Sequence, residues 1–456
     1  MRPNRSLVAI STFLIVFAVS LSLLVTGASA QFRPAPRGSL PAIDSKVQKA
    51  VIDSITATLD ESYVFADKAA RMDSLLHANL AAGAYRAFTD PVEFTQRLQA
   101  DVASVYLDRH MQILALPPGS VPSQKPGDDF FKSDAARERF RRNNYEFKKA
   151  EILAGNVGYL KLDMFVETDL AGSTAAAAMG FLSNADALII DLRDNPGGSA
   201  SMIQLLTGYL FKDSAHLIDW YDRKRNETTQ SWSPAWVPGK PLFDVPVYVL
   251  VSSHTGSAAE EFSFDLKNQK RATVVGERTG GAAHTVEFHT FDVGAFIAGL
   301  QLPRGRALDP VTKTNWEAVG VEPDIAVPAE KALSTAHLDA LKKLEENAKD
   351  DAAKSVLAWA RDGLESRGEP YSLPAKALGE YMGTFGPRRV FIEGSRLMYQ
   401  REGGPKLALV PMRKDLFGVE GTDVYRVRFT RGASGAIDGL VGMYDDGREQ
   451  QDPKTK

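Results

Sequence analysis

The chain has 456 residues, of which 44% are hydrophobic, and its formal net charge at pH 7 is −3. This length supplies material for more than one hydrophobic core, and the mildly acidic balance argues against a nucleic acid as partner. The sequence contains no cysteine, which excludes disulfides, a thiol nucleophile and a cysteine-ligated metal.

Residues 1–30 have the pattern of a secretory signal peptide. Arg2 and Arg5 precede an apolar run over residues 7–25, and residues 28–30 fit the small-residue cleavage rule. An uncleaved membrane anchor is the alternative, because the apolar run is long for a signal core. We therefore expect an exported chain, periplasmic or extracellular after cleavage, with no stable membrane insertion.

Residues 43–116 are predicted to form an N-terminal helical domain. Apolar residues recur at helical spacing from Val47 to Leu59. Farther along, Asp90 is placed as an N-cap, with Pro91 at the first helical position. Residues 117–149 are predicted to be a linker, which starts rich in Pro, Gly and Ser and ends dense in basic residues.

Strands alternate with helices over residues 150–330. We expect strands at 157–162, 187–192, 247–252 and 272–275, and helices at 170–182, 199–211 and 260–270. This alternation is typical of an α/β layered core with a largely parallel sheet. A helical connector is predicted at 331–366, and short alternating segments with turns predict a small all-β domain at 367–447.

Ser257 is the candidate nucleophile. It follows a buried strand and directly precedes an amphipathic helical stretch, so it is expected at a strand-to-helix turn. The free backbone N–H groups of a helix start can bind a developing oxyanion. Serine is also a favoured N-cap, so plain helix capping explains this segment equally well.

Two other predicted strands also lead into paired glycines, at residues 197–198 and 280–281. Paired glycines let the backbone approach a reacting atom and point N–H groups at it. Together with the Ser257 turn, these segments resemble the catalytic core of the C-terminal-processing (tail-specific) serine peptidase family. Within that family they are most similar to the branch of the tricorn protease core and the interphotoreceptor retinoid-binding protein repeats. The resemblance covers about residues 45 to 330 and implies a crotonase/ClpP-like layered core preceded by a small helical bundle.

The resemblance also implies a catalytic set of Ser257, His110 and Glu317. His110 ends an Asp-x-His pattern at the place where the branch has its catalytic histidine, and Glu317 lies in a Trp-Glu pair that matches the branch's glutamate segment. A histidine titrates near neutral pH and can remove the serine proton. Alternatively, Glu317 is a solvent-exposed acid in a loop without a catalytic role, and the nearby Glu322 is the other candidate for the third catalytic group.

The expected oxyanion hole consists of backbone N–H groups, from Ala258 and from Gly197 or Gly198. His254 and His284 lie beside the proposed site in the sequence, and either is an alternative base or a pocket residue. A metal held by two histidines of one strand, at positions 284 and 289, is rejected because a five-residue spacing puts them on opposite faces. No metal and no cofactor are expected.

Two departures from the processing peptidases stand out. Those enzymes pair serine with a lysine about twenty-five positions later, and the corresponding residue here is Ala282, which has no amine. The linker also runs almost directly into the core, which leaves no room for the peptide-binding PDZ domain that processing proteases insert there.

The expected function is cleavage of peptide amide bonds through an acyl-enzyme on Ser257, with a peptide or small acyl compound as substrate. The alternative is a non-catalytic binding protein for a hydrophobic small molecule or peptide, because the retinoid-binding relatives carry lipid ligands on this fold. The sequence defines neither the substrate's identity nor the oligomeric state.

Overall fold

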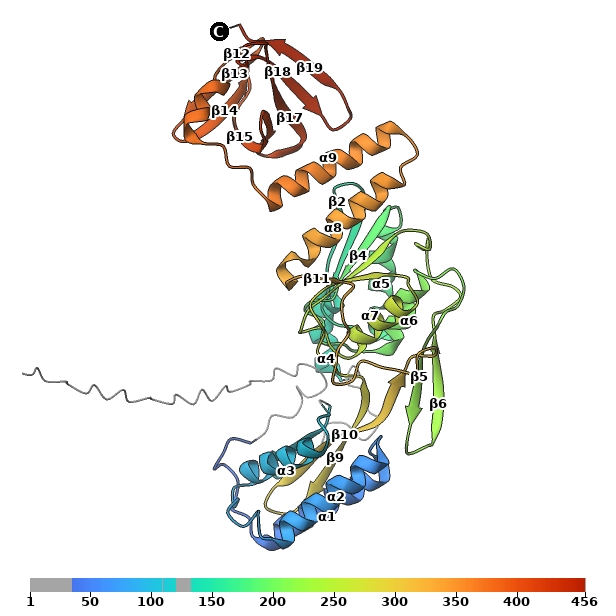
Figure 1. Ribbon diagram of the computed structural model, residues 1–456. Coiled ribbons are helices and arrows are strands. Elements are labelled where there is room, and N and C mark those ends of the chain that lie inside the picture. Colours follow the sequence, from blue (N-terminus) through green and yellow to red (C-terminus); the bar gives the residue numbers. More distant parts are fainter. Residues whose placement is uncertain (1–34, 109, 120–132, 456) are drawn as a thin grey trace, which may run out of the picture.

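The computed structural model describes residues 35–108, 110–119 and 133–455, so the expected signal peptide at 1–30 lies outside the described residues. An N-terminal helical layer, an α/β core and a C-terminal β domain follow one another along the molecule, with α8 and α9 between the last two (Figure 1). None of the helices in these ranges combines the length and the apolar composition needed to cross a membrane.

Three helices cover a sheet in the N-terminal layer: α1 (Ser45–Ser62), α2 (Ala66–Ala81) and α3 (Pro91–Val105). Asp44 and Asp90 begin α1 and α3 by accepting backbone N–H groups of the first turn. The sheet below them is antiparallel. In it β1 (Gln112–Leu116) pairs with β10 (Ile297–Leu308), which also pairs with β9 (His284–Asp292). The helices thus share their hydrophobic core with a hairpin that comes from far along the chain.

The same sheet continues into the middle of the molecule. Farther along β10, on the edge opposite β9 that also carries β1, lies β5 (His216–Asp222), which in turn pairs with β6 (Glu227–Trp232). The central strand β10 therefore connects the N-terminal layer physically to the α/β core. This shared strand brings residues near position 110 close to residues near position 284.

The α/β core contains a six-stranded sheet in the order β11-β8-β7-β4-β3-β2. Its strands are β2 (Phe147–Leu153), β3 (Val157–Leu162), β4 (Ala187–Asp191), β7 (Val247–Val251), β8 (Thr273–Gly276) and β11 (Ile325–Ala326). All neighbours are parallel except β2 and β3. The α/β layered core with a largely parallel sheet, expected from the sequence, is confirmed.

Both faces of this sheet are covered by helices. In β4, Leu188 and Ile190 face a core formed with α5 (Thr168–Leu182), α6 (Ala200–Gly208) and α7 (Ala258–Asn268). The alternate residues Ala187 and Ile189 face α8 (Ala329–Glu346) and α9 (Asp351–Gly368). Successive strand residues point to opposite faces, so a strand buried on both sides must be apolar throughout, as β4 and β7 nearly are.

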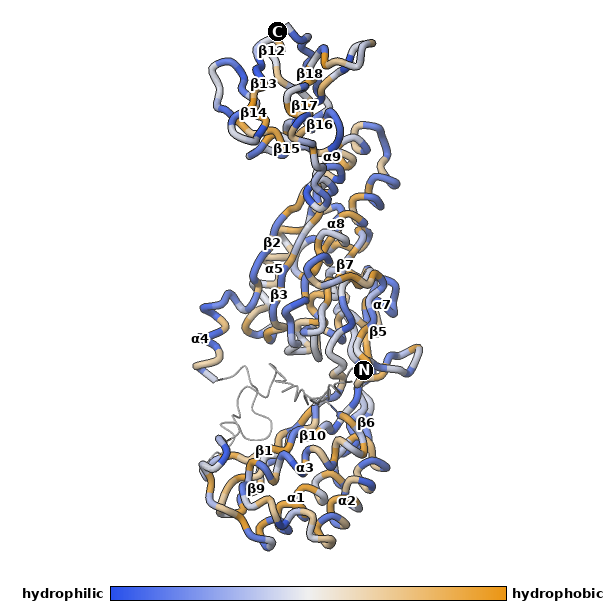
Figure 2. Tube along the Cα trace, turned by 60° about the vertical axis from the view of Figure 1, so that its left-hand side comes forward, coloured by the Kyte–Doolittle hydropathy of each residue, from blue (hydrophilic) through white to orange (hydrophobic). Residues whose placement is uncertain are grey.

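The basic stretch before the core forms α4 (Asp134–Arg142), followed by the short helix η2 (Asn144–Glu146). Most of α4 is hydrophilic in Figure 2, and Arg141 and Arg142 pair with Glu138 on the helix itself. These arginines form a solvated face, as the charge run indicated.

The C-terminal part is an all-β domain, as expected. After η3 (Ala375–Tyr381), eight antiparallel strands follow one another in sequence order. They are β12 (Gly383–Phe385), β13 (Arg388–Glu393), β14 (Arg396–Arg401), β15 (Lys406–Arg413), β16 (Leu416–Val419), β17 (Thr422–Arg431), β18 (Ile437–Tyr444) and β19 (Glu449–Pro453). A bridge between Phe385 and Lys454 brings the last strand back to the first, which closes a barrel. The strand β19 lies beyond residue 447, where the sequence analysis ended this domain; the domain boundaries otherwise stay predictions.

Candidate active site

Ser257 occupies the turn between β7 and α7 with a backbone φ of 48° and ψ of −118°. Residues other than glycine rarely adopt a positive φ, and such a conformation costs on the order of 1–3 kcal/mol unless the surroundings impose it. Here the Ser257 N–H donates to the Glu260 carboxylate at 2.8 Å. Ser257 is thus the N-cap of α7, with Glu260 at the capping-box position, but its backbone is in a strained conformation that an N-cap does not need.

Glu260 anchors this turn to the loop that follows β8. Its fully buried carboxylate also accepts from the Thr279 hydroxyl at 2.5 Å, the Gly281 N–H at 2.6 Å and the Ala282 N–H at 2.9 Å. Burial raises the pKa of Glu260, although these hydrogen bonds oppose the rise. The sequence position where a processing peptidase has its lysine thus donates a backbone N–H to this carboxylate.

The first glycine turn lies directly against the serine. A Cβ on Gly197 would come within 2.8 Å of the Ser257 Cβ and 2.9 Å of the Ala258 nitrogen. The Gly197 N–H itself donates to the Asn195 side chain at 2.8 Å. Within the described residues, no hydrogen bond uses the N–H of Gly198 or of Ala258. The two N–H groups left to bind an oxyanion beside Ser257 are therefore those of Gly198 and Ala258.

This glycine turn is fixed from both sides. The Phe165 N–H donates to the Gly197 carbonyl at 2.9 Å, and the Phe165 carbonyl accepts from Ser199 at 2.7 Å. Just upstream, Arg193 forms an ion pair with Asp191 at 2.6 Å. The backbone here is preorganised, which an oxyanion hole requires.

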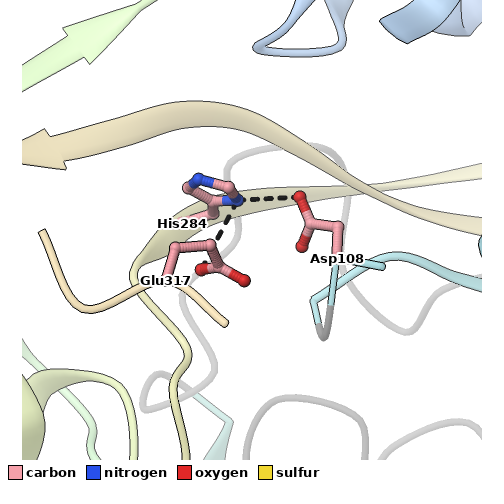
Figure 3. A group of neighbouring side chains, drawn as sticks. All are labelled: Asp108, His284 and Glu317. Carbon is pink, nitrogen blue, oxygen red and sulfur yellow. Dashed lines mark hydrogen bonds and ion pairs between the residues drawn. The ribbon is translucent and has the colours of Figure 1, made fainter. Parts of the chain in front are cut away.

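A second group of side chains joins His284, Asp108 and Glu317 (Figure 3). His284 Nδ1 lies 2.7 Å from Asp108 Oδ2 and 3.5 Å from Glu317 Oε2, and all three side chains are buried. Burial alone would raise the pKa of Asp108. The hydrogen bond from His284 and the charges of His284 and His110 lower this pKa, and the net shift is downward. Asp108 therefore holds His284 as a hydrogen-bonded carboxylate.

His110 borders this group and is the more accessible histidine. Its side chain is 14% exposed, whereas that of His284 is fully buried. His110 Nδ1 accepts from the His284 N–H at 3.3 Å and lies 3.7 Å from Glu317 Oε2, which is too long for a hydrogen bond. The loop is tied down by Gln301 of β10, which donates to the His110 carbonyl at 2.7 Å.

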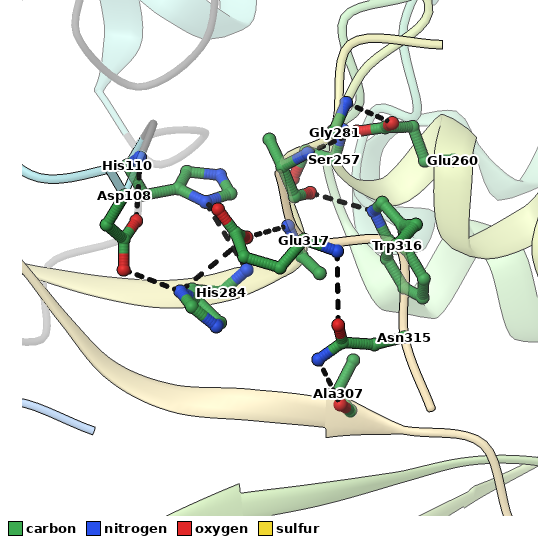
Figure 4. Close-up of polar contacts among 12 residues, drawn as sticks. Asp108, His110, Ser257, Glu260, Gly281, His284, Ala307, Asn315, Trp316 and Glu317 are labelled. Carbon is green, nitrogen blue, oxygen red and sulfur yellow. Dashed lines mark hydrogen bonds and ion pairs between the residues drawn. The ribbon is translucent and has the colours of Figure 1, made fainter. Parts of the chain in front are cut away.

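Glu317 connects the histidines to the serine side of the site. The Ala283 N–H donates to its Oε2 at 2.6 Å, and its Oε1 is buried with no hydrogen-bond partner in the described ranges. In Figure 4 the Glu317 carboxylate faces the two histidines, while the Glu260 carboxylate accepts from Ser257 and from Gly281, two residues before Ala283 in the chain. No hydrogen bond among the described residues joins either histidine to Ser257.

The remaining candidates lie outside this arrangement. His254 is exposed, and within the described residues its side chain forms no hydrogen bond or ion pair with this group. Glu322 is exposed and pairs with Arg278 instead of a histidine.

Asp108, His284 and Glu317 are also the residues that could hold a metal ion, because one ligand atom from each lies within 4.8 Å of the others. In the structure the histidine and the aspartate already satisfy each other by a hydrogen bond.

Sequence reasoning missed two positions of the candidate site. Asp108 was noticed only as part of the Asp-x-His pattern, and its partner His284 is 176 residues away, so no local signal could pair them. Glu260 did have a signal, since a serine followed three residues later by glutamate is a capping-box pattern.

A serine in a strained strand-to-helix turn, with free N–H groups beside it and a histidine–carboxylate group nearby, is the arrangement of a serine-type hydrolase. The model for "Peptidase family S41" matches residues 156–327, and that for the "N-terminal domain of Peptidase_S41 in eukaryotic IRBP" matches residues 40–138. The chain belongs to peptidase family S41, a family of serine peptidases.

Curated relatives include a carboxyl-terminal-processing protease of Picosynechococcus sp., 30% identical over 46% of this chain and 49% of that protein. The chloroplastic carboxyl-terminal-processing peptidase 2 of Arabidopsis thaliana is also 30% identical, over 42% of this chain and 37% of that protein. The chain thus spans half or less of the length of these relatives. Among solved structures, the tricorn protease is 13% identical, with a TM-score of 0.37 over 64% of this chain and 35% of that one.

Proposed function

We propose that this chain is a serine-type peptidase that cleaves amide bonds of peptides through an acyl-enzyme on Ser257. The observation that carries the proposal is the strained Ser257 turn, with φ of 48°, packed against Gly197, while the N–H groups of Gly198 and Ala258 have no hydrogen-bond partner among the described residues. A serine that only capped a helix would need neither the strain nor the glycine turn.

His110 is the proposed base because it is the more exposed of the two clustered histidines. It removes the Ser257 proton as Oγ attacks the substrate carbonyl, and it then gives this proton to the leaving amine. The N–H groups of Gly198 and Ala258 hold the oxyanion, and water hydrolyses the acyl-enzyme.

Glu317 is proposed to orient His110 through Nδ1. For this the present 3.7 Å separation must shorten by about 0.8 Å to a normal hydrogen bond, as catalytic contacts often do when substrate binds. His110 Nδ1, which here accepts from the His284 N–H, must give up that bond and carry the ring proton in order to donate to Glu317. This leaves Nε2 free to accept the serine proton. Asp108 and His284 support Glu317 from the buried side.

The site of action is proposed to be outside the cytoplasm. Arg2, Arg5 and the apolar run of residues 7–25 support export through a cleaved signal peptide. N-terminal sequencing of the protein recovered after expression with its leader tests this. A mature start at Gln31 supports it, and an intact Met1 contradicts it.

The proposal is tested by labelling the purified protein with a fluorophosphonate probe. We expect the wild type to be labelled, Ser257→Ala not at all, and His110→Ala at least about 100-fold more slowly, since general bases contribute about 10²–10⁴-fold. His254→Ala is the matched control and should label like the wild type. Labelling that survives His110→Ala but not His284→Ala would move the base to His284. A wild type that is never labelled would leave a binding protein as the function.

A further inference from the structure

Arg306 stands out as a cation without an acidic partner next to the candidate site. Two arginines lie two positions apart on β10. Arg304 pairs with Asp222 and lies 3.4 Å from Glu287, whereas no carboxylate of the described residues pairs with Arg306. The Nε atom of Arg306 is buried and has no hydrogen-bond partner within these residues.

The register of the sheet places Arg306 beside the histidine group. β10 lies between β9 and β5, and Arg306 is the direct neighbour of His284 on one side and of Tyr221 on the other. Directly opposite residues of an antiparallel pair have side chains on the same face, with Cβ atoms about 4.5–5.5 Å apart. The guanidinium therefore lies on the face that carries His284.

Aromatic rings hold the guanidinium in this position. The Arg306 Cζ lies 5.6 Å from the centre of the Phe65 ring and 5.5 Å from that of Tyr221. The same Phe65 ring packs edge-on against His284, with ring centres 5.4 Å apart. Phe65 is thus the common neighbour of the arginine and the histidine.

This environment supplies stacking, and among the described residues no ion pair is formed by Arg306. A ring face stabilises a guanidinium by about 0.5–2 kcal/mol, yet it does not accept the in-plane N–H bonds. Leaving a buried N–H of a charged group without an acceptor is costly. The planar fork of arginine is matched best by a carboxylate or phosphate that accepts two parallel hydrogen bonds.

We propose that Arg306 binds a carboxylate of the peptide substrate and so selects which peptides reach Ser257. This inference rests on the proposed peptidase function, since the carboxylate arrives with the peptide. The carboxylate belongs either to the C-terminus of the peptide or to an acidic side chain, and both present the same planar acceptor.

The test is peptide binding to full-length protein carrying Ser257→Ala, so that no probe is cleaved. Three fluorescent hexapeptides of alanine and leucine serve as probes: one with a free C-terminal carboxylate, one with an amidated C-terminus, and one amidated with a single internal glutamate. We expect Arg306→Met to weaken a carboxylate-bearing probe at least about tenfold, with the amidated neutral probe changed less than about twofold. The probe that shows this loss identifies the source of the carboxylate.

Two further variants complete the test. Arg306→Lys keeps the charge but lacks the fork, so it should restore only part of the affinity. Arg304→Met removes a paired arginine from the same strand and should leave all three affinities unchanged. Equal weakening of all three probes by Arg306→Met would overturn the inference, because packing of the rings would then be the residue's only role. Equal affinity of the wild-type site for neutral and carboxylate probes would overturn it as well.

The proposed peptidase function is tested in a separate experiment, the fluorophosphonate labelling of protein that retains Ser257. Absent labelling together with carboxylate-dependent binding would remove the peptidase function but keep the Arg306 site. Normal labelling together with binding that does not depend on a carboxylate would keep the peptidase function but remove the Arg306 site.

Discussion

The candidate site and the C-terminal barrel are built in opposite ways. In the barrel every strand from β12 to β19 pairs with its neighbour in the sequence. In the site, Asp108 and His284 are 176 residues apart in the chain, and Ser257 and Glu317 come from two other segments. Local pairing makes a domain that its own sequence determines, whereas the site exists only when several distant segments are packed together.

This contrast predicts that the barrel and the core respond independently to cavity mutations. Phe417 is fully buried in the barrel and Phe262 in the α7 face of the core. Either change to alanine should cost about 3–5 kcal/mol of its own domain's stability. Calorimetry should show two transitions, with Phe417→Ala lowering one while Ser257 labelling stays unchanged. A single transition that shifts as a whole would contradict the independence.

Glycine-to-alanine substitutions extend the comparison between the candidate site and the barrel to single residues. A Cβ on Gly198 would lie 2.1 Å from the Phe165 carbonyl oxygen, at a φ of 138°. Gly198→Ala must therefore move the turn, and because it displaces an oxyanion donor, labelling should slow about 100- to 1,000-fold. Gly394, in the barrel turn after β13, has a φ of 63° and nothing within 4 Å of a Cβ. Gly394→Ala should cost about 1–2 kcal/mol of barrel stability and no activity.

The buried Glu260 should respond far more strongly than an exposed glutamate of the barrel. In Glu260→Gln the new amide faces backbone N–H groups with its own donors, so we expect a loss of about 1–3 kcal/mol and slower labelling. Glu420, which forms an exposed pair with Arg396, is the control, and Glu420→Gln should change stability by less than about 1 kcal/mol. Denaturant titrations measure both, and equal effects would remove the special role of the Ser257 turn.

The last prediction is a pH dependence that belongs to the core alone. Burial raises the pKa of Glu261 on α7 to about 8, and neighbouring Asp265 is raised as well. The folded state then binds more protons than the unfolded state, whose glutamate titrates at about 4.3. Glu261 should therefore lower stability as pH rises from about 4.3 through about 8, by at most about 1.4 kcal/mol per pH unit, and Asp265 should add to this fall. Glu261→Gln should flatten the core transition over this range, and an unchanged slope would exclude Glu261 as its source.

The sequence predicted those parts that local patterns determine. The strand β3 begins and ends where expected, at residues 157 and 162, because its apolar run is bounded by turns. The position of Ser257 before α7 was also predicted, from the buried strand and the helical pattern around it. The all-β character of residues 367–447 was predicted in the same way, although β19 lies beyond that range.

The sequence did not predict the β9–β10 hairpin beneath the N-terminal helices. Nothing local in residues 284–308 indicates that they pair with β1 or complete the core of α1 to α3, since such pairings depend on tertiary packing. The contact between Asp108 and His284 could not be predicted either, because it too depends on tertiary packing. The catalytic roles of Ser257, His110 and Glu317 stay predictions that the labelling experiment decides.

The hairpin shared between the helical layer and the core sets an order of events during synthesis. A ribosome releases His110 and its loop long before β9 and β10, yet β1 has no partner strand until residues 297–301 have emerged. Glu317 follows later still. Until then the growing polypeptide carries its serine and its histidines without the scaffold that gathers them, so a peptidase of this construction stays inert while it is being made.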